Sequence, residues 1–241
     1  MGKLRYYYGA MNSLKTGTLF TKVYQFEQCG CNTILLKPFF DTRDVEIKSR
    51  AISDSRPCIS FGSRDNLLEI IPNHMVHDKL NVVFVDEVNF ITKYQVRQLW
   101  KLSKEYDVDV FVYGLKTNYL NRLFEASEEL LILADTIEEI KSMCSRCYNK
   151  ATTHLRYVND IPVFSGESCV VGDIKGKEYY VSVCQECWHK EYEERWYDKD
   201  IEIHYFFIFF KKNVEKIVYI WYTIYIIYIQ VIINYFRAWI N

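Results

Sequence analysis

The sequence lacks a strong charge of either sign. It has 30 lysine and arginine residues against 31 aspartate and glutamate residues, so its formal net charge is −1. A nearly neutral chain has no overall field that would attract nucleic acid or an anionic membrane. No basic stripe flanks its paired cysteines, which disfavours a zinc-finger protein that binds nucleic acid. We therefore expect no nucleic-acid partner.

A secretory signal is also lacking, because the residues after Met1 lead directly into a segment typical of a strand. We therefore expect a cytoplasmic protein with reduced thiols. Four of the eight cysteines stand in two Cys-x-x-Cys pairs. In a reducing compartment such pairs indicate a metal site rather than disulfides.

In the first part of the chain, short apolar runs alternate with segments in which apolar residues recur at helical spacing. The predicted strands are Leu4–Tyr8, Thr33–Lys37, Val82–Val85 and Val108–Tyr113, and the predicted helices are Thr16–Cys29 and Thr92–Tyr106. Thr92 is the expected N-cap of the second helix. The alternation predicts an α/β fold with a parallel sheet covered on both faces. The charged segment Asp44–Arg56 lacks periodicity and is predicted to be an exposed loop.

Changes in composition divide the chain into three parts. Residues 1–141 are predicted to form a nucleotide-binding α/β domain, and residues 142–200 a small β-rich domain that carries the paired cysteines. Gln185–Lys199, within the second part, is charged and predicted to be helical. Residues 201–241 form an apolar tail that differs from both.

The first predicted strand runs into a candidate phosphate-binding loop (P-loop). The pattern that cradles a nucleotide is Gly, four residues, then Gly-Lys-Ser/Thr. Here Leu14 replaces the second glycine, and its Cβ would cost about 1–2 kcal/mol in the left-handed conformation that glycine permits. The alternative is a chance match at a strand–helix turn. The candidate phosphate-binding residues are Gly9, Ala10, Met11, Asn12, Ser13, Leu14, Lys15 and Thr16.

Two carboxylates follow the third predicted strand. Ligands of open parallel sheets bind beyond the carboxyl ends of the strands, where Asp86 and Glu87 stand. Asp86 is a candidate Mg²⁺ partner together with Thr16, and Glu87 is a candidate general base that takes a proton from an attacking hydroxyl. The plain alternative is a solvated strand end. Asp41 and Arg43, after the second strand, are further candidates for contact with phosphate or acceptor.

The paired cysteines are the strongest signal in the sequence. Two Cys-x-x-Cys pairs separated by a β-rich insert suit a tetrahedral Zn²⁺ site with four thiolates, which leaves no open position and is therefore structural. The alternative is four free buried thiols. The candidate ligands are Cys144, Cys147, Cys184 and Cys187, whereas His154 and His189 are interpreted as bystanders.

Together these motifs resemble the thymidine kinases of the tetrameric cellular and bacterial type, over about Leu4–Trp196. The resemblance rests on the P-loop segment, Leu36-Lys37-Pro38 with Asp41-Thr42-Arg43, Phe84-Val85-Asp86-Glu87 through Asn89-Phe90, Tyr113-Gly114-Leu115-Lys116-Thr117, Leu123-Phe124-Glu125, and Tyr180-Val181-Ser182-Val183-Cys184. The zinc cysteines fall in the right places among them.

The resemblance implies a RecA-like α/β domain and a zinc-bearing lasso domain. It implies transfer of the ATP γ-phosphoryl group to the 5′-hydroxyl of thymidine in deoxynucleoside salvage, with ATP–Mg²⁺ as phosphoryl donor. It implies Glu87 as general base, and the nucleoside-binding residues Phe90, Tyr119, Phe124 and Tyr180, with the lasso backbone near Val170–Lys177. A cytosolic homotetramer inhibited by dTTP is implied as well.

The chain departs from the family pattern at three positions and in its tail. Leu14 replaces the loop glycine and puts ATP affinity and rate in doubt, which makes a catalytically impaired relative the alternative function. Asn89 stands where Gln is usual, and Tyr119 where Phe is usual. In the tail, Ile217–Phe236 is apolar and long enough to cross a bilayer. The tail has three interpretations: a membrane anchor, a packing helix, or a read-through or frameshift product.

Overall fold

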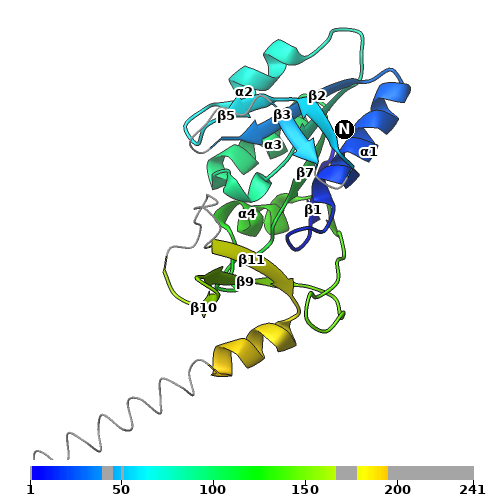
Figure 1. The fold of residues 1–241 in the computed structure, drawn as a ribbon. Helices are drawn as coiled ribbons and strands as arrows, with labels where there is room; N and C mark the ends of the chain where they lie inside the picture. The colour runs from blue at the N-terminus through cyan, green and yellow to red at the C-terminus, as the bar shows by residue number, and fades with distance from the viewer. Residues whose placement is uncertain (1, 40–45, 50–51, 167–177, 195–241) are drawn as a thin grey trace, which may run out of the picture. The chain divides into compact units, whose positions relative to one another are not determined.

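The computed structural model describes residues 2–39, 46–49, 52–166 and 178–194 (Figure 1). Met1–His189 form one compact unit, and Lys190–Asn241 form a second, of which residues 190–194 are described. Within the described ranges, no helix has the length and apolar character needed to cross a membrane. The interpretations of the tail, including Ile217–Phe236, therefore concern residues outside the described part.

A six-stranded parallel sheet forms the centre of the first unit, in the order β5-β2-β6-β7-β1-β8. Its strands are β1 (Leu4–Tyr8), β2 (Asn32–Pro38), β5 (Ile59–Phe61), β6 (Asn81–Val85), β7 (Asp109–Gly114) and β8 (Thr136–Glu139). The parallel sheet and its four inner strands confirm the sequence prediction. The two edge strands, β5 and β8, were not predicted.

Helices cover both faces of this sheet, as Figure 1 shows. Side chains alternate along β1: Tyr7 packs with Leu19 and Phe20 of α1, whereas Tyr6 belongs to the core on the opposite face. That core receives side chains from α2 to α4. The helices are α1 (Lys15–Gln28), α2 (Leu67–Ile70), α3 (Lys93–Glu105) and α4 (Glu125–Leu133), with 3₁₀ turns η1 (Ile71–His74) and η2 (Val88–Phe90).

The start of α3 shows how local sequence sets an element. Thr92 is the N-cap, as predicted: its hydroxyl accepts a hydrogen bond from the backbone N–H of Gln95, and the Gln95 side chain accepts one from the Thr92 N–H. This reciprocal capping box satisfies two backbone donors that the first turn leaves unpaired.

The predicted exposed loop at Asp44–Arg56 is wrong in its described part. Strands β3 (Glu46–Ser49) and β4 (Asp54–Pro57) form an antiparallel hairpin. Ile47 is buried in the core that α1 forms with the sheet, and Ser49 is buried too. Only two buried residues in alternation mark β3, which is too short a pattern to separate a strand from a loop.

The paired cysteines belong to a small antiparallel sheet, hereafter the cysteine module (residues 142–189). Its strands β9 (Thr153–Val158), β10 (Ile161–Val163) and β11 (Glu178–Val183) lie in the order β10-β9-β11. Asn159 and Asp160 connect β9 to β10 with φ angles of 51° and 62°, the left-handed pair that a two-residue hairpin requires. The β-rich module is as predicted. Residues 185–194 are helical, as predicted, and residues 195–199 lie outside the described part.

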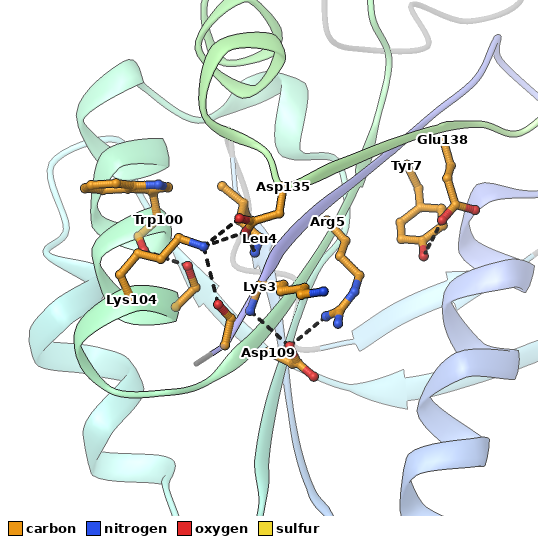
Figure 2. Close-up of polar contacts among 11 residues, drawn as sticks. Lys3, Leu4, Arg5, Tyr7, Trp100, Lys104, Asp109, Asp135 and Glu138 are labelled. Carbon is orange, nitrogen blue, oxygen red and sulfur yellow. Dashed lines mark hydrogen bonds and ion pairs between the residues drawn. The ribbon is translucent and has the colours of Figure 1, made fainter.

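A set of charged contacts fastens the amino-terminal ends of the strands (Figure 2). Asp109, at the start of β7, accepts hydrogen bonds from the Lys3 N–H and from Arg5. Asp135, just before β8, accepts one from the Leu4 N–H at 2.7 Å and pairs with Lys104 near the end of α3. These contacts join α3 and three neighbouring strands, and they leave the carboxyl ends of the strands for the site.

Candidate active site

The P-loop connects β1 to α1 at the carboxyl edge of the sheet. At Gly9 an added Cβ would lie 2.3 Å from Ser13 Oγ and 2.5 Å from the Ile140 carbonyl oxygen, so only glycine fits there. The following α1 presents its amino terminus to the loop, a position that favours a bound anion. The loop therefore has the backbone of a phosphate site.

Leu14 adopts the left-handed conformation, with φ 63° and ψ 25°, at the N-cap of α1. Glycine enters this region freely, whereas a residue with a Cβ is strained there. The Leu14 side chain is 58% exposed. The structure therefore keeps the backbone that a glycine would take, and the leucine side chain is turned largely to solvent.

Lys15 is the cation of the loop. Its Nζ donates to the Ala10 carbonyl at 2.8 Å and to the Gly9 carbonyl at 3.5 Å. Burial lowers the pKa of Lys15 below its ordinary value, and the nearby carboxylates of Glu87 and Asp86 oppose that shift. The ammonium group is thus held against the loop carbonyls beside two acidic groups.

Asp86 and Glu87 follow β6 and face the start of α1. Thr16 Oγ1 donates to Asp86 Oδ2 at 3.0 Å. Burial, and then the charge of Glu87, raise the pKa of Asp86 to about 7. Glu87 has a left-handed backbone, φ 52°, and its N–H donates to Asp86 Oδ1. Strained backbone of this kind is typical of functional sites.

A cavity of ≈ 440 Å³ is lined by Lys15, Thr16 and Glu87 together with other residues of the loop. Such a volume lies within the range of small-molecule sites. Among the described residues, Ser13 Oγ is one of the buried polar atoms without a hydrogen-bond partner, and Ser13 lines this cavity. The lining consists of Met11, Asn12, Ser13, Leu14, Lys15, Thr16, Gly17, Lys48, Ser49, Glu87, Phe90 and Leu115.

The four predicted nucleoside-binding aromatics form two pairs in the structure. Phe90 and Phe124 meet edge to face with ring centroids 5.8 Å apart, and Phe90 lines the cavity. Tyr119 and Tyr180 meet edge to face at 6.3 Å. Phe124, Tyr119 and Tyr180 are not among the residues that line the cavity.

The Tyr119 hydroxyl makes two hydrogen bonds. It donates to the Ser165 carbonyl at 3.1 Å and accepts a hydrogen bond from Arg156 Nη1 at 3.2 Å. Arg156 in turn pairs with Glu178 at 2.6 Å. This hydroxyl therefore ties the Tyr119 ring to the cysteine module.

The four paired cysteines converge on one point. The Sγ atoms of Cys144, Cys147, Cys184 and Cys187 all lie within 4.8 Å of one another. Thiolates about 2.3 Å from a tetrahedral zinc would be separated by about 3.8 Å, so the donor set and its spacing fit a structural zinc ion. Burial opposes ionisation of Cys144, but backbone N–H groups, with that of Arg146 first, outweigh it and lower its pKa to about 6. The cysteines are therefore positioned to hold a metal.

Sequence reasoning missed several residues that shape the site. Lys48 and Ser49 line the cavity from β3, in the segment that was predicted to be an exposed loop. His154, interpreted as a bystander, is not among the clustered metal-ligand candidates but accepts a hydrogen bond from the Met11 N–H. No spacing in the sequence signals these contacts. The predicted Asp41 and Arg43, and the lasso segment near Val170–Lys177, lie outside the described residues.

The sequence is similar to known proteins over most of its length. The family model described as thymidine kinase matches residues 2–188. The chain is similar to the thymidine kinase of Rhodopirellula baltica, with 39% identity over 188 residues, covering 77% of this chain and 87% of that protein. It is 37% identical over 193 residues to the thymidine kinase of Francisella tularensis subsp. tularensis, covering 78% and 97%. For that of Streptococcus gordonii the figures are 36% over 191 residues, 79% and 97%.

Proposed function

Because the chain belongs to the thymidine kinase family, we propose that it transfers the γ-phosphoryl group of ATP to the 5′-hydroxyl of thymidine. The observation that carries this proposal is the cavity that P-loop residues and Glu87 line together, with Asp86 hydrogen-bonded to Thr16 of that lining. It joins the parts that phosphoryl transfer needs: a phosphate cradle, oxygen donors for a cation, and a carboxylate for the acceptor proton.

The P-loop residues Gly9 to Thr16 would bind the phosphates of ATP. Their fit to a phosphate is supported by the unpartnered Ser13 hydroxyl and by the amino terminus of α1. Lys15 would exchange its hydrogen bonds to the Ala10 and Gly9 carbonyls for bonds to the β- and γ-phosphates. Its charge would then stabilise the negative charge that develops during transfer.

Thr16 and Asp86 would hold Mg²⁺. A hydroxyl and a carboxylate oxygen 3.0 Å apart offer the hard oxygen ligands that this cation prefers. When bound, the ion neutralises charge on the β- and γ-phosphates. Asp86 is kept next to the loop by the Leu36 carbonyl, which accepts a hydrogen bond from its backbone N–H.

Glu87 would act as general base. As the 5′-oxygen forms its bond to the γ-phosphorus and the bond to the β-phosphate oxygen breaks, the hydroxyl proton passes to the Glu87 carboxylate. The hydrogen bond from the Glu87 N–H to Asp86 fixes the backbone from which this side chain projects.

Phe90, Phe124, Tyr119 and Tyr180 would surround the thymine. Phe90, which lines the cavity and touches Phe124, links the phosphate end of the site to the base end. Asp41 and Arg43 remain proposed contacts to phosphate or acceptor.

The remaining properties follow the family resemblance. We propose a structural Zn²⁺ on the four cysteines, a nucleotide-binding domain at 1–141 and a lasso domain at 142–200. A cytoplasmic homotetramer inhibited by dTTP completes the proposal. Light scattering of the purified chain tests the tetramer, and the rate with and without dTTP tests the inhibition.

The test of the proposed function is transfer from labelled ATP to thymidine by the full chain. We expect phosphorylated thymidine from the wild type and a loss of about 10²-fold or more in Glu87→Gln, the usual contribution of a general base. Zinc content and thermal unfolding show whether each variant is folded.

Leu14→Gly separates the proposed kinase from a catalytically impaired relative. If the wild type does not phosphorylate thymidine but the Leu14→Gly variant does, the chain is an impaired relative. If both proteins are folded, bind zinc and still fail to phosphorylate thymidine, the kinase proposal is wrong.

A further inference from the structure

Met11, in the middle of the P-loop, is held by two side chains from the cysteine module. Its backbone N–H donates to His154 Nε2 at 2.8 Å, and its carbonyl accepts a hydrogen bond from Ser182 Oγ at 2.7 Å. These partners lie 143 and 171 residues further along the chain. The backbone N–H and the carbonyl of Met11 therefore both have hydrogen-bond partners outside the loop.

His154 and Ser182 reach the same residue because they are cross-strand partners. They stand directly opposite each other on the antiparallel strands β9 and β11. Opposed residues of such a pair project from the same face of the sheet. One rung of this sheet therefore presents an acceptor and a donor side by side.

The contact requires the neutral form of His154, since Nε2 accepts the Met11 hydrogen. The side chain is 3% exposed. Burial, and then the charge of Lys15, lower the pKa of His154 to about 4, so the imidazole is neutral near pH 7. Ser182 is also buried, at 7% exposure. Both partner side chains are therefore buried, and the two hydrogen bonds themselves are partly buried.

The loop has a particular need for such support. Of its eight residues only Gly9 is glycine, yet Asn12 and Leu14 both have left-handed backbones, with φ 60° and 63°. Non-glycine residues persist in that region when the surrounding structure holds them there. Met11 directly precedes this pair of turns.

We propose that His154 and Ser182 are positioning residues for phosphate binding: through Met11 they hold the P-loop in the shape that receives ATP. This inference rests on the proposed function in one respect, which is that the bound nucleotide is ATP. It makes one rung of the cysteine module part of the phosphate site, although neither side chain lines the cavity.

The experiment compares His154→Leu, which removes the acceptor, with His154→Gln, whose amide oxygen reaches about as far as Nε2. Hydrogen exchange of the segment 9–14 is followed in the ligand-free full chain. We expect exchange about tenfold faster in His154→Leu and in Ser182→Ala, the size expected for one buried hydrogen bond. His154→Gln should exchange as the wild type does. Ile161→Ala, exposed on β10 of the same sheet, is the control.

Kinetics supply a second readout. The KM for ATP should rise about tenfold in His154→Leu for the same reason, while the KM for thymidine stays within about twofold and His154→Gln restores the wild-type values. If His154→Leu does not fold, His154→Asn, with a shorter reach than Gln, takes its place.

Unchanged exchange in His154→Leu and Ser182→Ala would overturn the proposal, and so would equal exchange in the Leu and Gln variants. Because exchange is measured without substrate, it tests the loop contact even if the wild type does not phosphorylate thymidine. Failure of the proposed function and failure of this inference are therefore distinguishable.

Discussion

Two positions of the P-loop, Asn12 and Leu14, have left-handed backbones without being glycine. Asn12 tolerates a left-handed backbone better than most residues, whereas Leu14 gains nothing from it. The Leu14 side chain adds bulk beside the cavity as well. Backbone strain and bulk are separate effects, and a pair of substitutions at this one position can divide them.

Leu14→Gly should strengthen ATP–Mg²⁺ binding, because it removes a side chain that lines the cavity. It should also raise the free energy of unfolding by about 1–2 kcal/mol, because the ligand-free loop already carries the Cβ strain. Leu14→Ala keeps the Cβ and removes only the bulk. Calorimetric titration of the three proteins measures the effect of bulk, for which Ala should match Gly. Urea unfolding measures the effect of strain, for which Ala should match Leu. Affinity that is no higher in Leu14→Gly than in the wild type would contradict the prediction.

His154 should make stability depend on pH. Its folded pKa, about 4, lies below the ordinary 6.5, so the unfolded chain binds more protons between these values. Stability is therefore full above pH 6.5 and falls as the pH drops towards 4, by up to about 3 kcal/mol. Urea unfolding across this window should show a smaller loss in His154→Gln. The fully exposed His77 supplies the control His77→Gln, which should leave the slope unchanged.

At the scale of elements, the charged contacts in Figure 2 connect β1 to partners more than a hundred residues away. Asp135 joins the Leu4 N–H of β1 and Lys104 of α3. Partial burial opposes ionisation of Asp135, but the hydrogen bonds from Lys104 and Leu4 outweigh it and lower its pKa. Strand β8 is thereby fastened next to β1.

Asp135→Asn should lower the free energy of unfolding by about 1–3 kcal/mol near neutral pH, since it weakens hydrogen bonds to a charged group. The folded pKa is lowered, so the contribution is present above the unfolded pKa of about 4 and is lost as pH falls below it. Urea unfolding at two pH values measures both effects. Lys101→Met, which breaks the exposed Lys101–Glu105 pair on the same helix, should change stability by less than about 0.5 kcal/mol.

The elements that sequence reasoning recovered carry their signal locally. Helix α3 has its capping box within four residues, and β6 is a continuous apolar run. Strand β8 could not be found this way, because its four residues are mostly exposed and are specified by pairing with β1. The hydrogen bonds on Met11 were equally hidden, since their partners are set by the tertiary fold rather than by spacing.

For the whole molecule, the four-cysteine cluster and the proposed phosphate site belong to one compact unit. Because the fold brings these cysteines together, the free energy of metal binding adds to the free energy of folding. Among the described residues, the buried core of the cysteine module consists of Leu155, Tyr157, Val183 and two of the cysteines, and only partly buried residues such as Phe164 and Trp188 pack against it. Metal binding should therefore be a main source of its stability.

We expect one zinc ion per chain, and a module that becomes sensitive to protease when Cys187→Ser or a chelator removes the ion. Elemental analysis and limited proteolysis measure both. Cys29→Ser changes an exposed cysteine outside the cluster and should alter neither. A chain that lacks metal yet resists protease would contradict the prediction.

The position of β1 in the sheet also has a consequence for synthesis on the ribosome. β1 is made before the other strands of its sheet, yet it pairs with β7 and β8, so that Leu4 aligns with Val110. At about 5–20 residues per second, the ribosome needs roughly 5–20 s to deliver the chain from one partner to the other. Throughout that interval the newly made Tyr-rich segment has no native neighbour in the sheet. The nascent chain therefore offers an apolar segment that a chaperone can bind before the P-loop exists.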